Sequence, residues 1–441
     1  MQALDETHAP DRKSWVQTAN RDGCEFPIQN LPLGMFSRIG EEPRFGIAIG
    51  DSVLDVAAAF HAGLISSDSL AAARLNESPS LNSILALGPD FLTALRRQVA
   101  DLLDANGRDR DEAEAKRDKV LVAQSQCKFL LPTQIGDYTD FYAGIHHAHM
   151  TGSLLRPDNP LPLNYKWTPI ASHGRSSSIV VSGTDIHRPR GQLGSSGGQP
   201  PRYAPSIRLD FELELGLYVG HGNAMGSTID IADASRHIAG YCLLNDWSAR
   251  DIQRWEAVPL GPLLSKSFAS TLSPWIVTAD ALLPFRGPIM TRDPGDPAPL
   301  PHLLDAEDQS SGGFDIEISV WLQTEKMRRD NLSPMQLASS NAKYLYWSPA
   351  QMVTHHTSGG CNLRPGDLIG SGTISGPTST ERGSLLEMSL GGKNPVALPN
   401  GETRGFLDDG DEVTFKAICR RDGFIPIGFG ACVGRVLPAV G

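Results

Sequence analysis

The segment from Ile207 to Leu215 constrains the fold of this chain most, because apolar and polar residues alternate along it without a break. Successive side chains of a β-strand point to opposite faces, so its apolar residues are predicted to share one buried face. The other face carries Arg208, Asp210, Glu212 and Glu214. Same-face neighbours lie about 7 Å apart, close enough for two carboxylates to meet at one hard cation such as calcium or magnesium. An ordinary half-exposed strand, with its carboxylates in water, is the alternative.

Further strand-like runs alternate with turns, as expected for a chain with 44 glycines and 32 prolines. The predicted strands are Ser178–Ser182, Ile207–Val219, Ile238–Asn245, Phe314–Leu322 and Val413–Cys419, and a hairpin is predicted from Phe45–Ile49 and Val53–Val56. A helical stretch is expected over Ser80–Leu103, followed by a charged, exposed connector over Asp104–Lys119. Ile186–Ser206 and Pro284–Gly313 are expected to be long loops. The fold class is therefore mostly β with a few helices, that is, α+β.

Charge and composition exclude several classes of protein. The formal net charge is −11 and no block of Lys and Arg occurs, so a nucleic-acid partner is not expected. No apolar run approaches the roughly 18 residues of a membrane span, so a membrane partner is not expected either. The six cysteines are far apart in the sequence, which favours free thiols in the cytoplasm.

A second acidic candidate, Asp246, stands at the end of the predicted strand Ile238–Asn245. Ser248 is predicted to cap a short helix over 249–256. On that helix Arg250, Gln253 and residue 257 share one face, which places two hydrogen-bond donors a turn away from the acidic site. A solvent-exposed amphipathic helix is the alternative.

Three histidines, His146, His147 and His149, stand close together in the sequence. No HExxH motif or Cys/His framework accompanies them, so zinc is disfavoured. An imidazole titrates near neutral pH, so a general base is the better functional interpretation, with at least two of the three left as surface residues. The apolar run Ser384–Met388, interpreted as a strand, holds Glu387. A buried carboxylate there needs a partner, and a histidine is a natural one.

Taken together, these segments resemble the fumarylacetoacetate hydrolase family. The runs Asn245–Asp251 (NDWSARD) and Leu363–Leu368 (LRPGDL) are specific to its superfamily. The resemblance covers nearly the whole chain in order, through Phe26–Pro32, Asp137–Tyr142, His173–Arg175, Arg208–Leu215, Asn245–Glu256, Pro259–Pro262, Thr354–His356, Asn362–Gly376 and Gly428–Gly430.

The resemblance implies a small Src-homology-type β-barrel with a helical connector over residues 1–125. A larger catalytic domain, a rolled β-sandwich, would follow over residues 126–441. It also implies a cytoplasmic homodimer acting on a small diketo acid. The implied reaction is the metal-dependent cleavage of a carbon–carbon bond, in which fumarylacetoacetate and water give fumarate and acetoacetate, the last step of tyrosine and phenylalanine breakdown. Calcium, with magnesium nearby, is the implied cofactor.

The resemblance also assigns residues to roles. Calcium carboxylates fall on Asp140, Glu212, Glu214 and Asp246. A magnesium site falls on Asp246, Lys266 and Ser270, where the family usually has threonine at the last position. Catalytic groups fall on His147, Glu387, Arg250, Gln253 and Lys266. Substrate contacts fall on Tyr142, Arg156, Gln253, Ala257 and Thr373.

Two positions depart from the family pattern, because Ser172 and Ala257 stand where the family usually has tyrosines in its substrate pocket. Loss of two phenols predicts a larger or less selective pocket. A related superfamily hydrolase or decarboxylase acting on an acylpyruvate or other oxo acid is therefore the alternative enzyme. A non-catalytic metal-binding protein with the same fold is the alternative from a different class.

Overall fold

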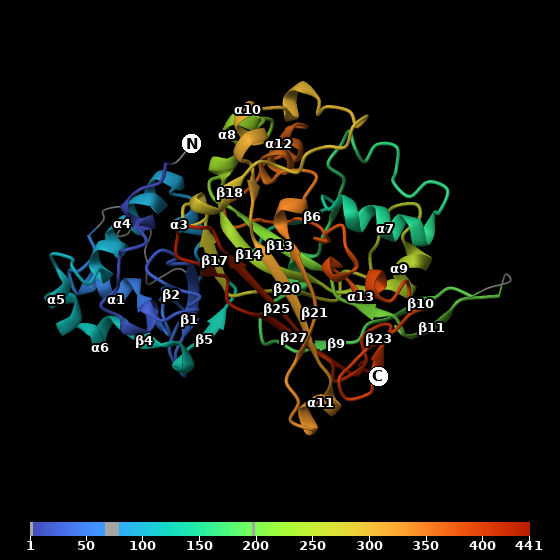
Figure 1. The fold of residues 1–441 in the computed structure, drawn as a ribbon, viewed down its shortest axis with the longest axis horizontal. Coiled ribbons are helices and arrows are strands. Elements are labelled where there is room, and N and C mark those ends of the chain that lie inside the picture. The colour runs from blue at the N-terminus through green and yellow to red at the C-terminus, as the bar shows by residue number, and fades with distance from the viewer. Residues whose placement is uncertain (1–2, 67–78, 196–198) are drawn as a thin grey trace.

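The computed structural model describes residues 3–66, 79–195 and 199–441, and it confirms a mostly β fold with short helices. Thirteen of the described strands form the largest sheet, which crosses the molecule in Figure 1. Its main path runs β4-β3-β2-β1-β17-β14-β13-β22-β6-β7, with β5, β8 and β16 paired beside it. These strands are β1 (Leu33–Ser37), β2 (Arg44–Ile49), β3 (Ser52–Asp55), β4 (Leu121–Ala123), β5 (Lys128–Leu130), β6 (Tyr138–Phe141), β7 (Ala171–His173), β8 (Ile179–Val181), β13 (Leu213–Val219), β14 (Ile238–Asp246), β16 (Ser270–Leu272), β17 (Trp275–Thr278) and β22 (Leu368–Gly370).

A second sheet packs against one face of the first, and the remaining described strands form two-stranded ribbons. The second sheet contains β9 (Ile186–His187), β20 (Glu317–Gln323), β21 (Met335–Asn341), β25 (Glu412–Cys419), β26 (Ile427–Gly428) and β27 (Cys432–Leu437). The ribbons are β10 (Arg190–Leu193) with β11 (Arg202–Pro205), β12 (Leu209–Asp210) with β15 (Ser248–Ala249), β18 (Arg286–Gly287) with β19 (Gly313–Phe314), and β23 (Val396–Ala397) with β24 (Thr403–Arg404). The β10–β11 ribbon projects from the body of the molecule in Figure 1.

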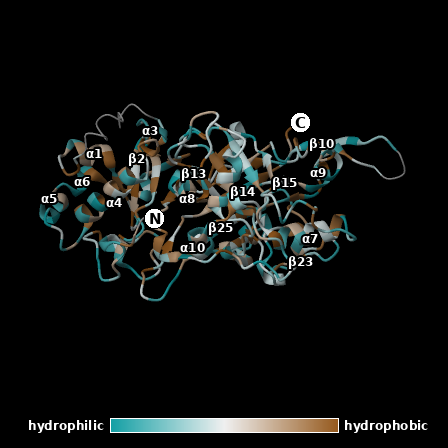
Figure 2. Cartoon of the chain, turned by 90° about the horizontal axis from the view of Figure 1, so that it is seen from above, coloured by the Kyte–Doolittle hydropathy of each residue, from teal (hydrophilic) through white to brown (hydrophobic). Residues whose placement is uncertain are grey.

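Short helices cover the edges of the sheets. They are α1 (Val56–His61), α3 (Asn82–Leu85), α4 (Pro89–Leu103), α5 (Arg110–Ala115), α6 (Arg117–Val120), α7 (Ile145–Leu155), α8 (Ile231–Ala234), α9 (Arg250–Glu256), α10 (Ala306–Ser311), α11 (Glu325–Arg329), α12 (Pro349–Thr357) and α13 (Leu385–Met388). The predicted exposed connector contains α5 and α6, and Figure 2 shows hydrophilic residues around α5.

The predicted hairpin of the N-terminal region is confirmed, because β2 and β3 pair across Gly50 and Asp51. The helical stretch predicted over Ser80–Leu103 contains two helices, since Gly88 adopts a φ of 84° and separates α3 from α4. The pairings do not confirm a closed N-terminal barrel. Among the described residues the strands form an open path, and β1 continues it into the larger sheet by pairing with β17.

Alternation along the predicted strand Ile207–Val219 holds, but the strand is not continuous. It divides into β12 and β13 because its partner changes from β15 to β14. Leu213, Leu215 and Leu217 pack into the core shared with the second sheet, as expected for one apolar face. Ile207, which was predicted to be buried, is 64% exposed because it precedes the paired residues.

Three further local predictions are corrected. Phe314–Leu322 divides into β19 and β20. Ser248 does not cap a helix, since it lies in β15 opposite Asp210 and its hydroxyl donates to the Asp246 carbonyl. Ser384–Met388 is not a strand, because Ser384 caps the short helix α13. The two predicted loops also contain regular structure, namely β9 to β11 in the first and β18, α10 and β19 in the second.

No helix of the described part of the chain is long and apolar enough to cross a membrane. The six cysteines are free thiols, as the sequence predicts.

A buried arginine is expected to hold the N-terminal region together. Arg96 of α4 is 5% exposed and donates to the carbonyls of Gln29 and Asn30 and to the Thr7 hydroxyl. Arg96→Met leaves these acceptors without a donor, so the free energy of unfolding should fall by about 3 kcal/mol in urea denaturation. Arg110→Met is the matched control, because Arg110 forms an exposed pair with Glu114 and should change stability by less than about 0.5 kcal/mol. Equal effects of the two variants would contradict this assignment.

Candidate metal centre and acid–base pair

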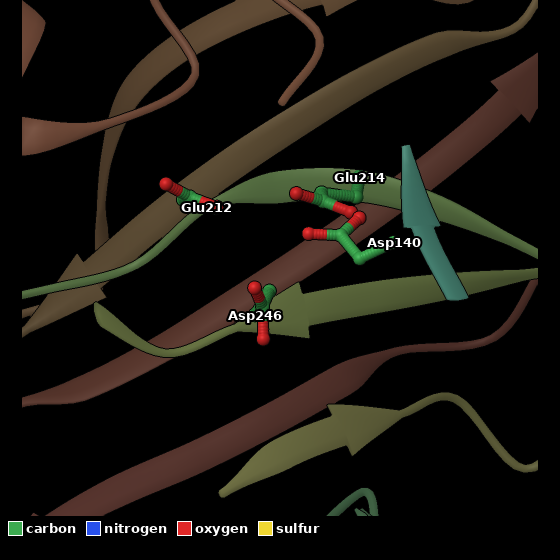
Figure 3. A group of neighbouring side chains, drawn as sticks. All are labelled: Asp140, Glu212, Glu214 and Asp246. Carbon is green, nitrogen blue, oxygen red and sulfur yellow. The ribbon is translucent and has the colours of Figure 1, made fainter. Parts of the chain in front are cut away.

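Four carboxylates converge over the part of the large sheet in which β14, β13, β22 and β6 lie side by side. Asp140 lies on β6, Glu214 on β13 and Asp246 at the end of β14, while Glu212 immediately precedes β13. One oxygen from each lies within 4.8 Å of the others. Figure 3 shows the four side chains and the strands that carry them. Asp140 and Gly370 are register partners, which brings the parallel strands β6 and β22 together beneath the group. The sheet therefore places these carboxylates on one face, as the sequence analysis expects.

The cluster contains more negative charge than its protein neighbours satisfy. Neither oxygen of Glu214 nor Oδ1 of Asp140 receives a hydrogen bond from any described residue, although these atoms are buried. Burial, followed by the charges of neighbouring carboxylates, raises the pKa of both Asp140 and Glu214 well above the ordinary value. Buried carboxylate oxygens without donors fit a hard divalent cation, so the residues present fit a metal.

A lysine and a serine close the other side of the cluster. Lys266 Nζ donates to Glu212 Oε2 at 2.5 Å and to Asp246 Oδ2 at 2.6 Å. The Ser270 hydroxyl donates to Asp246 Oδ1 at 2.9 Å. Burial disfavours the charged amine, but the carboxylates of Asp246 and Glu212 outweigh it and raise the pKa of Lys266. Lys266 is therefore a fixed cation.

Arg250 adds a second cation beside Glu212. Its Nη1 donates to Glu212 Oε1 at 2.6 Å and to Gln253 Oε1 at 3.3 Å, while Nη2 has no partner among the described residues. Burial would raise the pKa of Glu212, but Lys266 and Arg250 overcome burial and lower it. Glu212 therefore stays ionised, unlike Glu214.

An acid–base pair lies beside these groups. His147 of α7 is 2% exposed, and its Nδ1 lies 2.7 Å from Glu387 Oε2. The Ser375 and Ser384 hydroxyls donate to the same oxygen at 3.0 and 2.8 Å. Burial alone would raise the pKa of Glu387, but His147 and these hydroxyls lower it. An ionised Glu387 holds the proton of His147 on Nδ1 and leaves Nε2 as the basic atom.

The other two histidines of the group lie elsewhere. His146 is half-buried with its ring centroid 5.8 Å from that of Tyr344, and His149 is exposed. Of the two histidines expected at the surface, His149 is exposed and His146 is half-buried.

Only some of the candidate substrate residues lie beside the acid–base pair. The Tyr142 ring meets the His147 ring edge-on at 5.7 Å, and its hydroxyl lies 2.7 Å from Thr151 Oγ1. Burial raises the pKa of Tyr142 to about 12, so the phenol stays protonated. The Thr373 hydroxyl is buried without a partner among the described residues. Ala257 follows α9 and is half-buried, whereas Arg156 is exposed and its guanidinium donates to the Pro160 carbonyl at 3.3 Å.

Two features of the site escaped the sequence analysis. Gly370 must lack a side chain, because a Cβ there would lie 2.6 Å from Asp140 Oδ1 and 3.2 Å from Glu214 Oε2. Asp210, which shares the polar face with Glu212 and Glu214, does not join the cluster but contacts Arg250. The glycine gives no local signal in the sequence, whereas the alternation had already marked Asp210 as a polar residue in a buried strand.

Comparisons with known proteins agree with this geometry. The family model described as "Fumarylacetoacetate (FAA) hydrolase C-terminal" matches residues 138–437, and "Fumarylacetoacetase N-terminal" matches residues 29–132. The chain is 46% identical over 423 residues to the fumarylacetoacetase of Homo sapiens, covering 95% of this chain and 98% of the relative. It is 44% identical over 433 residues to that of Oryza sativa subsp. japonica, covering 97% and 98%.

A solved structure shows the same fold. The fumarylacetoacetate hydrolase from psychrophilic Exiguobacterium antarcticum superposes with a TM-score of 0.50 at 16% identity, covering 92% of this chain and 99% of that one.

A methyl group at residue 370 should disturb metal binding. Gly370→Ala pushes the Asp140 and Glu214 carboxylates apart, so the dissociation constant for calcium, measured by calorimetry, should rise about 10- to 100-fold. Gly287→Ala is the control, because a Cβ there meets nothing within 4 Å. Wild-type calcium affinity in a folded Gly370→Ala variant would argue against the arrangement.

The metal-free protein should lose stability as the pH rises. Asp140 and Glu214 have raised pKa values, so the folded state holds their protons more tightly than the unfolded state does. The free energy of unfolding therefore falls as the pH rises above the ordinary glutamate pKa of 4.5. Urea denaturation in EDTA should reveal this slope, and calcium should flatten it.

Glu214→Gln tests whether ionisation of Glu214 causes this pH dependence of the free energy of unfolding. The amide cannot ionise, so the variant should show a weaker pH dependence in EDTA and little stabilisation by calcium. If the wild-type protein in EDTA became more stable as the pH rose, ionisation of the buried carboxylates would not destabilise the folded state.

Proposed function

Because the chain belongs to the fumarylacetoacetate hydrolase family, we propose that it hydrolyses fumarylacetoacetate to fumarate and acetoacetate. This is the last step of tyrosine and phenylalanine breakdown. The observation that carries the proposal is the convergence of four carboxylates beside a buried His–Glu pair. Carboxylates suit a divalent cation and the pair suits proton transfer from water, the two requirements for cleaving a β-diketone by hydrolysis.

Asp140, Glu212, Glu214 and Asp246 would hold calcium, and Asp246, Lys266 and Ser270 would adjoin a magnesium ion. When bound, a divalent cation supplies Lewis acidity toward the oxygens of the diketone. Support comes from the unpartnered oxygens of Asp140 and Glu214 and from the hydrogen bonds that Lys266 and Ser270 make to Asp246.

His147 is the general base in this proposal. Its Nε2 takes a proton from water, while ionised Glu387 stabilises the imidazolium through Nδ1. The hydroxide adds to the carbonyl carbon, and the carbon–carbon bond then breaks. The electron pair leaves with the acetoacetate fragment as an enolate, which takes up a proton. The net reaction thus consumes one water and gives two carboxylic acids, fumarate and acetoacetate.

Arg250, Gln253 and Lys266 are proposed to stabilise the oxyanion that forms during this addition. Arg250 Nη2, which has no partner among the described residues, is a free donor for that purpose. Tyr142 and Thr373 are proposed to contact the substrate. The ring contact of Tyr142 with His147 supports this, as does the Thr373 hydroxyl, which has no partner among the described residues. Arg156 and Ala257 complete the proposed substrate contacts, with Arg156 reaching the substrate carboxylate from the end of α7.

A second candidate substrate class is an acylpyruvate or another oxo acid. Ser172 of β7 is exposed and pairs in register with Asp140, so this position contributes no aromatic ring beside the cluster. Ala257 likewise carries only a methyl group. A pocket with this much room should accept diketo acids with larger substituents.

Turnover with and without chelator separates these possibilities. We expect hydrolysis of fumarylacetoacetate at a higher kcat/KM than any simple acylpyruvate, with loss of activity in EDTA and recovery with calcium. Preference for an acylpyruvate would favour the second class, and no turnover of any diketo acid despite bound metal would indicate a non-catalytic protein.

We further propose that residues 1–125 and 126–441 act as two domains, the first as a Src-homology-type barrel and the second as a rolled β-sandwich. A cytoplasmic homodimer is also proposed. The free cysteines support a reducing compartment. The exposed side chains of Val258, Leu260 and Leu263 support a contact with a second copy.

Removal of the imidazole should abolish the chemistry and leave the fold intact. His147→Ala should lower kcat at least about 100-fold, because no other described base reaches Glu387, while calcium affinity stays within about threefold of wild type. His149→Ala, two residues further along the same helix and exposed, is the matched control and should keep wild-type kcat. Wild-type turnover in His147→Ala would exclude this residue as the base.

A further inference from the structure

Asp210 is a fully buried carboxylate outside the cluster. It lies on β12, is 0% exposed, and is absent from the four residues that converge in Figure 3. Burial raises its pKa, while Arg250 and backbone donors oppose this effect. Keeping a charge here is costly, so the structure must provide it with strong partners.

The two oxygens of Asp210 connect three separate segments. Oδ2 accepts from Arg250 Nε at 2.9 Å and from the Leu386 N–H at 3.0 Å. Oδ1 accepts from the Leu385 N–H at 2.8 Å and from its own neighbour Phe211 at 2.9 Å. One carboxylate therefore binds the first residue of α9 and the first two residues of α13.

These two helices carry different parts of the proposed machinery. Arg250 of α9 contacts Glu212 and Gln253 on the oxyanion side. Glu387 of α13, one residue beyond Leu386, orients His147 on the acid–base side. Helix α13 has only four residues, Leu385–Met388, so it has little stability of its own and depends on outside contacts for its position.

We propose that Asp210 is a positioning residue that fixes the oxyanion donor Arg250 and the Glu387–His147 pair in one geometry. The inference rests on the proposed function for the chemistry, but the coupling itself is a property of the fold. Asp210 touches neither substrate nor the metal ligands in this role. It acts through Arg250 on one side and through the backbone of α13 on the other.

The carboxylate charge, and not only its shape, is required. All four contacts come from N–H donors, so both oxygens must accept. An asparagine amide at this position would present its own N–H groups to a donor on one side. Asp210→Asn therefore keeps the volume, but one orientation of the amide loses the links to Arg250 and Leu386. The other orientation loses the links to Leu385 and Phe211.

Double-mutant cycles test the coupling. We expect Asp210→Asn to lower kcat about 10- to 100-fold, with KM and calcium affinity within about threefold of wild type. In an Arg250→Ala or a Glu387→Gln background, Asp210→Asn should lower kcat much less than it does in the wild-type protein. The residue through which Asp210 acts is already changed in these backgrounds. A purely structural role would instead give fully additive losses in both cycles and would overturn the proposal.

Asp308→Asn is the matched control. Asp308 is also a buried carboxylate, 5% exposed, and accepts the Ser348 hydroxyl at the start of α12, away from the cluster. This variant should lose stability and keep wild-type kcat. An equal loss of kcat in Asp308→Asn would show that any buried aspartate has the same effect, and would overturn the assignment.

Hydrogen exchange tests the coupling without activity. The Leu385 and Leu386 amides should exchange at least about tenfold faster in Asp210→Asn, and also in Arg250→Ala, where Asp210 loses its cation. If Asp210→Asn does not fold, the exchange rates of these amides in Arg250→Ala test the coupling instead. Unchanged exchange in a folded variant would overturn the inference. If the wild-type protein did not hydrolyse the substrate but the variants still exchanged faster, the proposed function would be rejected and the coupling would stand.

Discussion

The structure around the site depends on repulsion among buried carboxylates. Asp140, Glu212, Glu214 and Asp246 meet over the part of the sheet that contains β14, β13, β22 and β6, where water is excluded. Lys266 and Arg250 satisfy Glu212 and Asp246, but they make no hydrogen bond to Glu214. Lys266 and Arg250 therefore compensate the charges of Glu212 and Asp246, whereas the charges of the other carboxylates would need a bound cation. This division explains why neighbouring acids on one strand have opposite pKa directions.

Much of this site could be predicted from the sequence. Strict alternation places Glu212 and Glu214 on one face, and the end of the predicted strand Ile238–Asn245 marks Asp246. The family resemblance supplies Asp140. The break between β12 and β13 could not be predicted, because it results from a change of partner strand and not from a change in local pattern. For the same reason Asp210, in phase with Glu212 and Glu214, turns toward α9 and α13.

The errors have a common physical cause. Ser384–Met388 looks like a strand because it is short and apolar, but a serine cap and the backbone contacts of Asp210 make it helical. Ser248 looks like a helix cap, but it lies in β15 and pairs with Asp210 of β12. In each case a partner distant in sequence overrides local preference, and local patterns carry no information about such partners.

The bare main chain at Gly370 has a consequence for ion choice. The wall of the carboxylate group on that side is backbone, held in register with β6 on one edge and β13 on the other. A rotamer change can adjust a side-chain wall, but hydrogen-bonded strands are stiff. On this side the room beside the carboxylates is thus set by the spacing of the strands and not by a rotamer, so the pairing of the sheet limits how far the group can expand around an ion.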